Sequence, residues 1–151
     1  MLGATQAGIA FSNSSVALVH GMSRPIGAHF HVPHGLSNAM LLPAVTRFSV
    51  VGAVARYAEA ARRIGFAENG DADAVATGKL VEGLTALNSD LAVPTPREYG
   101  IDSAIWEAKL DLMAEQALAS GSPANNPRVP DKSEIIALYR QVWAGEAASD
   151  R

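Results

Sequence analysis

All four histidines of this chain lie close together in the sequence, at His20, His29, His31 and His34. Neutral imidazole is the commonest nitrogen ligand of zinc and ferrous iron in proteins. His20 and His34 are 14 residues apart, which on one continuous helix would separate them by about 21 Å, too far to share an ion. Prolines and glycines between them allow the chain to fold back. If His20 ends one helix and His34 begins the next, both rings can meet at one metal ion.

The histidine pair is too small to be a complete metal site, and it has an alternative interpretation. A structural zinc site takes four protein ligands, and a catalytic site takes at least three. Residues 1–46 contain no Asp or Glu, so further ligands would come from later segments, from His29 or His31, or from outside the chain. Two histidines beside a helical corner can equally be hydrogen-bonded core residues. The spacing alone leaves both interpretations open.

Charged residues are almost absent from the segment that carries the histidines. The chain has 12 basic and 15 acidic residues, yet only Arg24 lies in residues 1–46. Polar residues interrupt the uncharged run at the N-terminus and no basic segment precedes it, which argues against a membrane span or a signal peptide. We therefore expect the first third to be buried inside a larger protein. The net charge of −3, without a basic stripe, predicts no nucleic-acid partner.

Helical periodicity dominates the sequence, which predicts an all-α fold: a multi-helix bundle in a single domain of residues 1–151. The cluster of Pro25, Gly27 and Pro33 is expected to end the first helix, and Pro43 to kink or divide the second. The expected helices span residues 2–20, 33 or 34 to 48, 51–65, 74–91, 102–119 and 131–146. The expected N-caps of the last three are Asp71 or Asp73, Asp102, and Asp131 or Ser133.

Five stretches of the sequence carry a family resemblance. They are AGIAFSN, VHG, PIGA, VPHGLSNAMLLPAV and, near the C-terminus, NPRVPDKSEIIALYRQVW. Together they resemble the C-terminal helical domain of the iron-containing (group III) alcohol dehydrogenases. The resemblance covers essentially the whole chain, and its core, PIGAHFHVPHGLSNAMLLP, is far more specific than a pair of histidines.

The resemblance implies a function for the histidine pair. In that family an N-terminal α/β domain binds NAD(P) through a Gly-rich loop, and an all-helical C-terminal domain holds a catalytic ion bound by an Asp and three His. His20 and His34 match the last two histidine ligands, which implies that they bind Fe²⁺ or, alternatively, Zn²⁺. The Asp, the first His and the nucleotide domain would lie upstream of Met1, and this chain has no phosphate loop of its own. NAD(P) is therefore not expected to bind this chain alone.

The resemblance implies an oxidoreductase that, in the intact family, converts a small alcohol to an aldehyde or ketone. A cytoplasmic location is expected, because a chain without cysteine is compatible with a reducing compartment. The isolated chain is expected to be inactive, since the nucleotide domain and two metal ligands are absent. Whether this chain is itself an enzyme stays open at this point.

Arg24 stands where many members of the family have a histidine thought to lie beside the substrate. Its guanidinium could hold a substrate carboxylate or a cofactor phosphate. It could instead only cap the C-terminal end of the first helix, where a cation suits the helix dipole. His29 and His31 resemble pocket-lining positions, although core or surface roles fit them as well.

The uncharged surface over residues 2–45 is expected to be covered by a partner, because soluble monomers rarely expose large apolar patches. The partner would be the missing nucleotide-binding domain or a second copy in a homo-oligomer. Two other functions therefore stay open. One is a noncatalytic helical module that self-associates through this surface, and the other is a metal-binding oligomer in which His20 and His34 of two chains supply four nitrogens.

Overall fold

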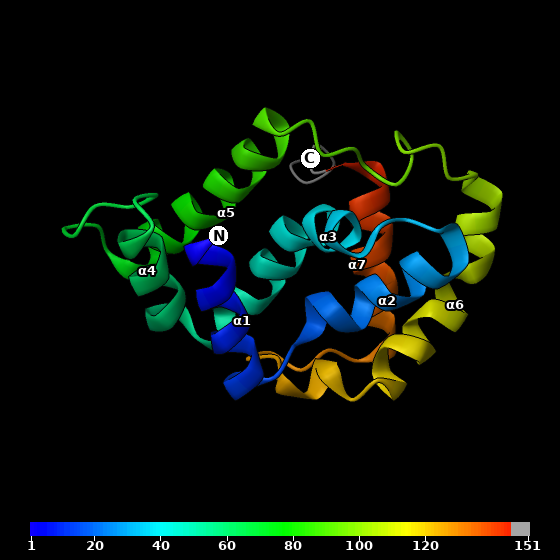
Figure 1. Ribbon diagram of the computed structural model, residues 1–151, viewed down its shortest axis with the longest axis horizontal. Coiled ribbons are helices and arrows are strands. Elements are labelled where there is room, and N and C mark those ends of the chain that lie inside the picture. The colour runs from blue at the N-terminus through cyan, green and yellow to red at the C-terminus, as the bar shows by residue number, and fades with distance from the viewer. Residues whose placement is uncertain (146–151) are drawn as a thin grey trace.

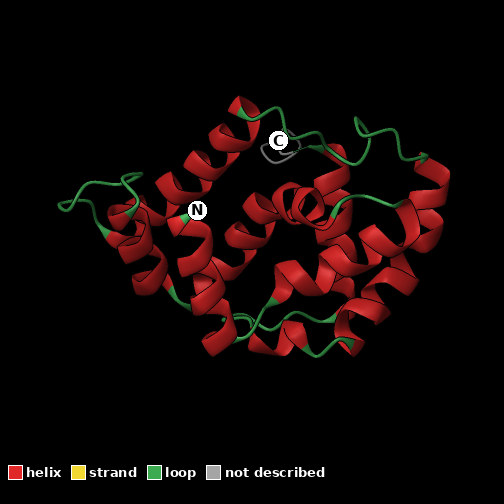
Figure 2. Cartoon of the chain, viewed as in Figure 1, coloured by secondary structure: helices red, strands yellow, loops and turns green. Residues whose placement is uncertain are grey.

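The structure is a computed structural model that describes residues 1–145. In this range the chain forms seven α-helices, two short 3-10 helices and no strand (Figures 1 and 2). The helices are α1 (Leu2–Ser14), α2 (Leu18–Phe30), α3 (His34–Ser49), η1 (Val50–Gly52), α4 (Val54–Arg63), α5 (Asp73–Asp90), α6 (Ser103–Ala119), η2 (Ser122–Asn125) and α7 (Lys132–Ala144). The all-α prediction is confirmed. No helix within residues 1–145 combines the length and the apolar character needed to cross a bilayer.

The predicted first helix is wrong, because two helices occupy its place. α1 ends at Ser14 and α2 begins at Leu18, so His20 lies in the first turn of α2 and not at the end of a helix. The break falls at Ser15, whose φ of 64° is in the left-handed region. It follows a run of Ser and Asn, whose side chains compete with the helix for backbone hydrogen bonds. The side chain of Asn13, for example, donates to the Ile9 carbonyl at 2.8 Å.

Pro25 and Gly27 do not end a helix, which corrects a second prediction. Pro25 is buried inside α2, and the helix continues to Phe30. It ends where His31 takes a left-handed conformation and donates its N–H to the Gly27 carbonyl at 3.0 Å. Likewise α3 runs undivided past Pro43. Burial of a helix face outweighs the lost backbone hydrogen bond at both prolines. The predicted start of α3 at His34 is confirmed.

Two predicted N-caps are confirmed. The Asp102 side chain accepts hydrogen bonds from the backbone N–H groups of Ala104 and Ile105 at the start of α6. At the start of α7, Asp131 and Glu134 form a capping box in which each side chain accepts the backbone N–H of the other.

The predicted cap of α5 is wrong. Ala72 occupies the N-cap position and makes no capping hydrogen bond with its side chain. Asp71 instead forms an ion pair with Lys79 at 2.8 Å, and Asp73 forms one with Arg62 at 2.6 Å. The two acids therefore tie the α4–α5 corner together, because basic partners compete with the backbone N–H groups for the carboxylates.

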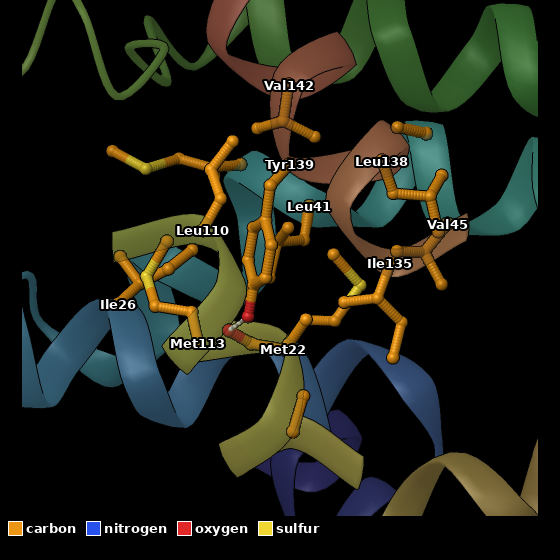
Figure 3. Packing of buried hydrophobic residues seen from close by; sticks show 14 of the residues in the cluster. Met22, Ile26, Leu41, Val45, Leu110, Met113, Ile135, Leu138, Tyr139 and Val142 are labelled. Atoms are coloured by element: carbon orange, nitrogen blue, oxygen red, sulfur yellow. Dashed lines mark hydrogen bonds between the residues drawn. The ribbon is translucent and has the colours of Figure 1, made fainter. Parts of the chain in front are cut away.

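The main core forms where α2, α3, α6 and α7 meet. Tyr139 of α7 is fully buried, and its hydroxyl donates to the Met22 carbonyl of α2 at 2.8 Å (Figure 3). Trp106 of α6 is also buried and contacts Tyr139 edge-on, with ring centres 5.8 Å apart. This aromatic contact and the tyrosine hydrogen bond fix α2 against the C-terminal helices, and α2 in turn carries His20.

A second, smaller cluster joins α4 to α5. It consists of Ala58, Ala61, Ala67, Ala76 and Leu80, with Tyr57, Phe66 and Leu84 packed against it. Small residues allow a close approach: a Cβ at Gly83 would lie 2.6 Å from the ring of Phe66. This corner lies at one end of the molecule, away from α6 and α7 (Figure 1).

Candidate metal centre

His20 and His34 lie next to each other. Their ring centres are 5.2 Å apart and their planes are tilted by 55°. With metal–nitrogen distances of about 2.0 to 2.1 Å, two imidazoles on one tetrahedral ion have ring centres about 5 Å apart. The observed separation therefore suits two ligands of a single ion.

The chain brings the two rings together by reversing direction after a complete helix. From His20 the backbone runs along α2, and residues 31–33 then lead back beside it. A Cβ added at Gly27 would lie 3.4 Å from the Val32 carbonyl oxygen, so residues 31–33 pack directly against α2. α3 then begins at His34. The fold-back predicted from the sequence is thus present, but it is made by the whole of α2 and not by a corner of prolines and glycines.

The surroundings of His20 favour the neutral imidazole. Partial burial lowers the pKa of His20 below its ordinary value, and positive charge at His34 and Arg24 lowers it further. Neutral imidazole has a free nitrogen lone pair, which is the form that binds a metal ion. His20 is therefore a competent nitrogen donor at neutral pH.

Asn38 is a functional candidate that the sequence reasoning missed. Its Nδ2 atom lies 3.0 Å from Nε2 of His34, one helical turn earlier on α3. Its Oδ1 atom is buried and has no hydrogen-bond partner among residues 1–145, an unusual situation for a polar atom. A side-chain amide in contact with a ligand ring fixes the orientation of that ring. The i, i+4 spacing of a polar residue from His34 was the signal that could have found it.

A cavity of about 560 Å³ opens beside His20, a size typical of small-molecule sites. Apolar side chains of α1, α2 and α3 form much of its wall, among them Phe11, Val19 and Leu42. Tyr57 also lines it, and burial raises the pKa of this phenol, which therefore stays protonated. The cavity is suited to the apolar part of a small molecule whose polar group lies at the histidine pair.

His29 and His31 do not join the pair. Nε2 of His29 lies 2.9 Å from Oε1 of Gln116 on α6, and His31 is exposed at the end of α2. The part of the chain that the structure describes contains no group of three or more His, Cys, Asp or Glu side chains that could hold an ion. Within residues 1–145 the histidine pair therefore has no third side chain of these types beside it.

Arg24 lies in the middle of α2, four residues after His20. The interpretation of Arg24 as a cap of the first helix is wrong, because α2 continues to Phe30. The side chain is exposed, and the sequence spacing places it on the same face of the helix as His20.

Comparison with known proteins agrees with this architecture. Residues 1–143 match the family model described as the Fe-containing alcohol dehydrogenase family, C-terminal. The NADPH-dependent butanol dehydrogenase of Clostridium saccharobutylicum is 36% identical over 140 residues, which cover 92% of this chain and 36% of that protein. The 1,3-propanediol dehydrogenase of Klebsiella pneumoniae is 34% identical over 137 residues, covering 91% of this chain and 35% of that protein.

Solved structures give the same result. A 1,3-propanediol oxidoreductase matches with a TM-score of 0.82 at 34% identity, over 90% of this chain and 35% of that chain. The iron-containing alcohol dehydrogenase of Thermococcus thioreducens matches with a TM-score of 0.80 at 36% identity, over 94% of this chain and 35% of that chain. The chain thus spans little more than a third of the length of these relatives. It belongs to the iron-containing alcohol dehydrogenase family, and it corresponds to the C-terminal, helical domain of that family.

Proposed function

We propose that this chain is the metal-binding part of a metal-dependent alcohol dehydrogenase, in which His20 and His34 bind one Fe²⁺ or, alternatively, Zn²⁺ ion. The observation that carries the proposal is the 5.2 Å separation of the two rings. Relatives over nearly the whole chain are named as butanol and 1,3-propanediol dehydrogenases. The expected substrate is therefore a small alcohol, or the corresponding aldehyde in the reverse direction.

Different residues of this chain would bind the metal ion and exclude water from the site. An ion held by His20 and His34 would supply Lewis-acid chemistry that lowers the pKa of an alcohol hydroxyl, and NAD(P)⁺ would supply the hydride acceptor. His20, which lines the cavity, and His34 beside it would hold that ion. Phe11, Val19 and Leu42 surround the alkyl part of the substrate and keep bulk water out, which strengthens electrostatic interactions at the reacting end.

The remaining parts of the active site would come from outside residues 1–145. These residues provide no third ligand beside the pair, and the sequence contains no Gly-rich phosphate loop. A nucleotide-binding domain would supply the NAD(P) site and further ligands. We therefore expect the chain alone, with Fe²⁺ or Zn²⁺, NAD(P)⁺ and short alcohols, to show little turnover.

A partner surface supports this arrangement. α1 buries none of its residues and exposes large apolar side chains, among them Leu2, Ile9 and Phe11. A nucleotide-binding domain or a second copy of the chain would cover them. We expect the complete enzyme in the cytoplasm, a location compatible with a chain that has no cysteine.

The metal proposal is tested by titrating the chain with Co²⁺ and measuring the heat of binding. We expect one ion per chain, and a loss of affinity of about tenfold or more in His20→Ala and in His34→Ala. His31→Asn is the matched control, because this exposed imidazole lies outside the pair and asparagine tolerates the left-handed conformation of the position. Unchanged Co²⁺ affinity in both His20→Ala and His34→Ala would overturn the proposal.

A further inference from the structure

Arg24 is an isolated positive charge beside the histidine pair. It is the only charged residue in residues 1–46. Its neighbours Ser23 and Pro25 are buried, whereas the Arg24 side chain is exposed. Within residues 1–145 no ion pair or hydrogen bond holds the guanidinium. The guanidinium has five N–H donors in a planar arrangement, and no Asp or Glu lies near it in the sequence. It is therefore available to bind an anionic ligand.

Helix geometry places Arg24 close to the proposed ion. Residues four apart on a helix have Cβ atoms about 5 to 6 Å apart on one face. The guanidinium of Arg24 and an ion held by His20 and His34 are therefore neighbouring positive charges. They repel each other unless an anion lies between them. Residues 1–46 contain no carboxylate, and an Asp ligand from outside this chain, which the family resemblance implies, would offset the charge of the ion but leave the guanidinium unpaired. The combination favours an anionic ligand that contacts both.

We propose that Arg24 binds the carboxylate of the substrate, and that the substrate is a short hydroxy acid, or the matching aldehyde acid, and not a neutral alcohol. This inference rests on the proposed metal-dependent alcohol dehydrogenase function. In it, the hydroxyl group lies at the histidine pair while the carboxylate accepts two parallel hydrogen bonds from the guanidinium, the geometry in which Arg binds carboxylates most strongly. Arg24 thus selects the substrate and does not take part in hydride transfer.

A phosphate of the cofactor is the other anion that an arginine could bind here. The pyrophosphate of NAD(P) is separated from the reacting nicotinamide by a ribose, and the 2′-phosphate of NADP is farther away still. Arg24 is only one helical turn from His20, so the anion and the reacting hydroxyl belong to one small molecule. A substrate carboxylate meets this condition and a cofactor phosphate does not.

The experiment measures ligand binding to the Co²⁺-loaded chain through the visible absorption of the ion and through calorimetry. The probes are 3-hydroxypropanoate, the neutral analogue 1-propanol, and adenosine 2′-monophosphate as the cofactor phosphate. The variants are Arg24→Gln, Arg24→Lys and the control Arg56→Gln. Arg56 is an exposed arginine on α4 whose charge does not act on His20. Circular dichroism confirms that each variant keeps the helical content of the parent chain.

We expect Arg24→Gln to weaken 3-hydroxypropanoate binding by about tenfold or more, as the loss of a hydrogen bond between charged groups does. Arg24→Lys should recover part of the loss because it keeps the charge without the planar fork, and Arg56→Gln should have no effect. Equal binding of 3-hydroxypropanoate by the parent chain and Arg24→Gln would overturn the inference, as would a tighter, Arg24-dependent binding of adenosine 2′-monophosphate. Failure of Co²⁺ to bind would overturn the proposed function itself, a result distinct from either of these.

Discussion

Helices α1 and α2 have the same length and both lack acidic residues, but their environments are opposite. Each has 13 residues and lacks acidic residues, and only α2 has a charged side chain, Arg24. α1 nevertheless buries none of its residues, whereas α2 buries six and lies against α3 and α6. The absence of charge therefore marks a segment suited to burial, but it does not reveal what buries it. α2 is buried by other helices of this chain, whereas nothing within residues 1–145 buries α1.

The difference between the two helices also divides their roles at the site. α2 carries His20 and Arg24 on a helix that the core holds rigidly, which suits residues that must keep a fixed geometry. α1 contributes Phe11 to the cavity wall without being anchored in the core. The positions of the proposed ligands therefore depend on the stability of this chain, and part of the cavity wall depends on whatever covers α1.

The largest expected difference between the two helices comes from a matched pair of isoleucine substitutions. Ile26 in α2 is fully buried, whereas Ile9 in α1 is 60% exposed. Ile26→Ala leaves a cavity in the core and should lower the free energy of unfolding by about 2 to 5 kcal/mol. Ile9→Ala removes a side chain that packs against little and should change it by less than about 0.5 kcal/mol. Urea unfolding followed by circular dichroism measures both; equal losses in the two variants would contradict the comparison.

A smaller effect is expected where α2 is tied to α7. The Tyr139 hydroxyl donates to the Met22 carbonyl inside the core, and burial raises the pKa of Tyr139 well above its ordinary range, so the donor proton stays in place. Tyr139→Phe should lower the free energy of unfolding by about 1 to 3 kcal/mol, the usual cost of losing a buried hydrogen bond. Tyr99→Phe is the control, because this tyrosine is 39% exposed. A Tyr139→Phe variant as stable as the parent chain would show that the hydrogen bond does not anchor α2.

Much of the fold was predictable from local sequence signals. Apolar spacing predicted the helices, and Asp102 and Asp131 predicted the starts of α6 and α7, because an N-cap is decided by residues within one turn. The errors fall where distant residues decide the outcome. Pro25 stays inside α2 because burial of that helix compensates for the lost hydrogen bond. Asp71 is drawn away from capping α5 by Lys79, eight residues later.

The sequence predicted which histidines meet, but not how the fold brings them together. The spacing of His20 and His34, read together with the family resemblance, predicted that the rings meet. It could not predict that a full helix lies between them, since the reversal depends on the left-handed conformation of His31 and on packing of the chain against Gly27. The contact of Asn38 with His34 was missed because an asparagine on a helix is usually solvated, and its burial is a tertiary property.

The smallest expected difference between α1 and α2 comes from two glycines inside them. Glycine within a helix lowers the stability of the helix by about 0.5 to 1 kcal/mol relative to alanine. Replacement by alanine should therefore give the same local gain in helix stability at both positions. At Gly8 of α1 the added methyl group meets nothing within 4 Å, whereas at Gly21 of α2 it lies 3.0 Å from the Cδ and Cγ atoms of the buried Pro123 ring. Gly8→Ala should therefore raise helical content without moving the unfolding midpoint, because α1 is not coupled to the core. Gly21→Ala should lower the free energy of unfolding by about 1 kcal/mol, since a rigid ring cannot give way without strain.

Amide hydrogen exchange separates the two cases: slower exchange confined to α1 in Gly8→Ala, and faster exchange throughout α2 in Gly21→Ala. If Gly8→Ala instead slowed exchange in the core helices, α1 would be part of the cooperative unit and the contrast between the two helices would fail.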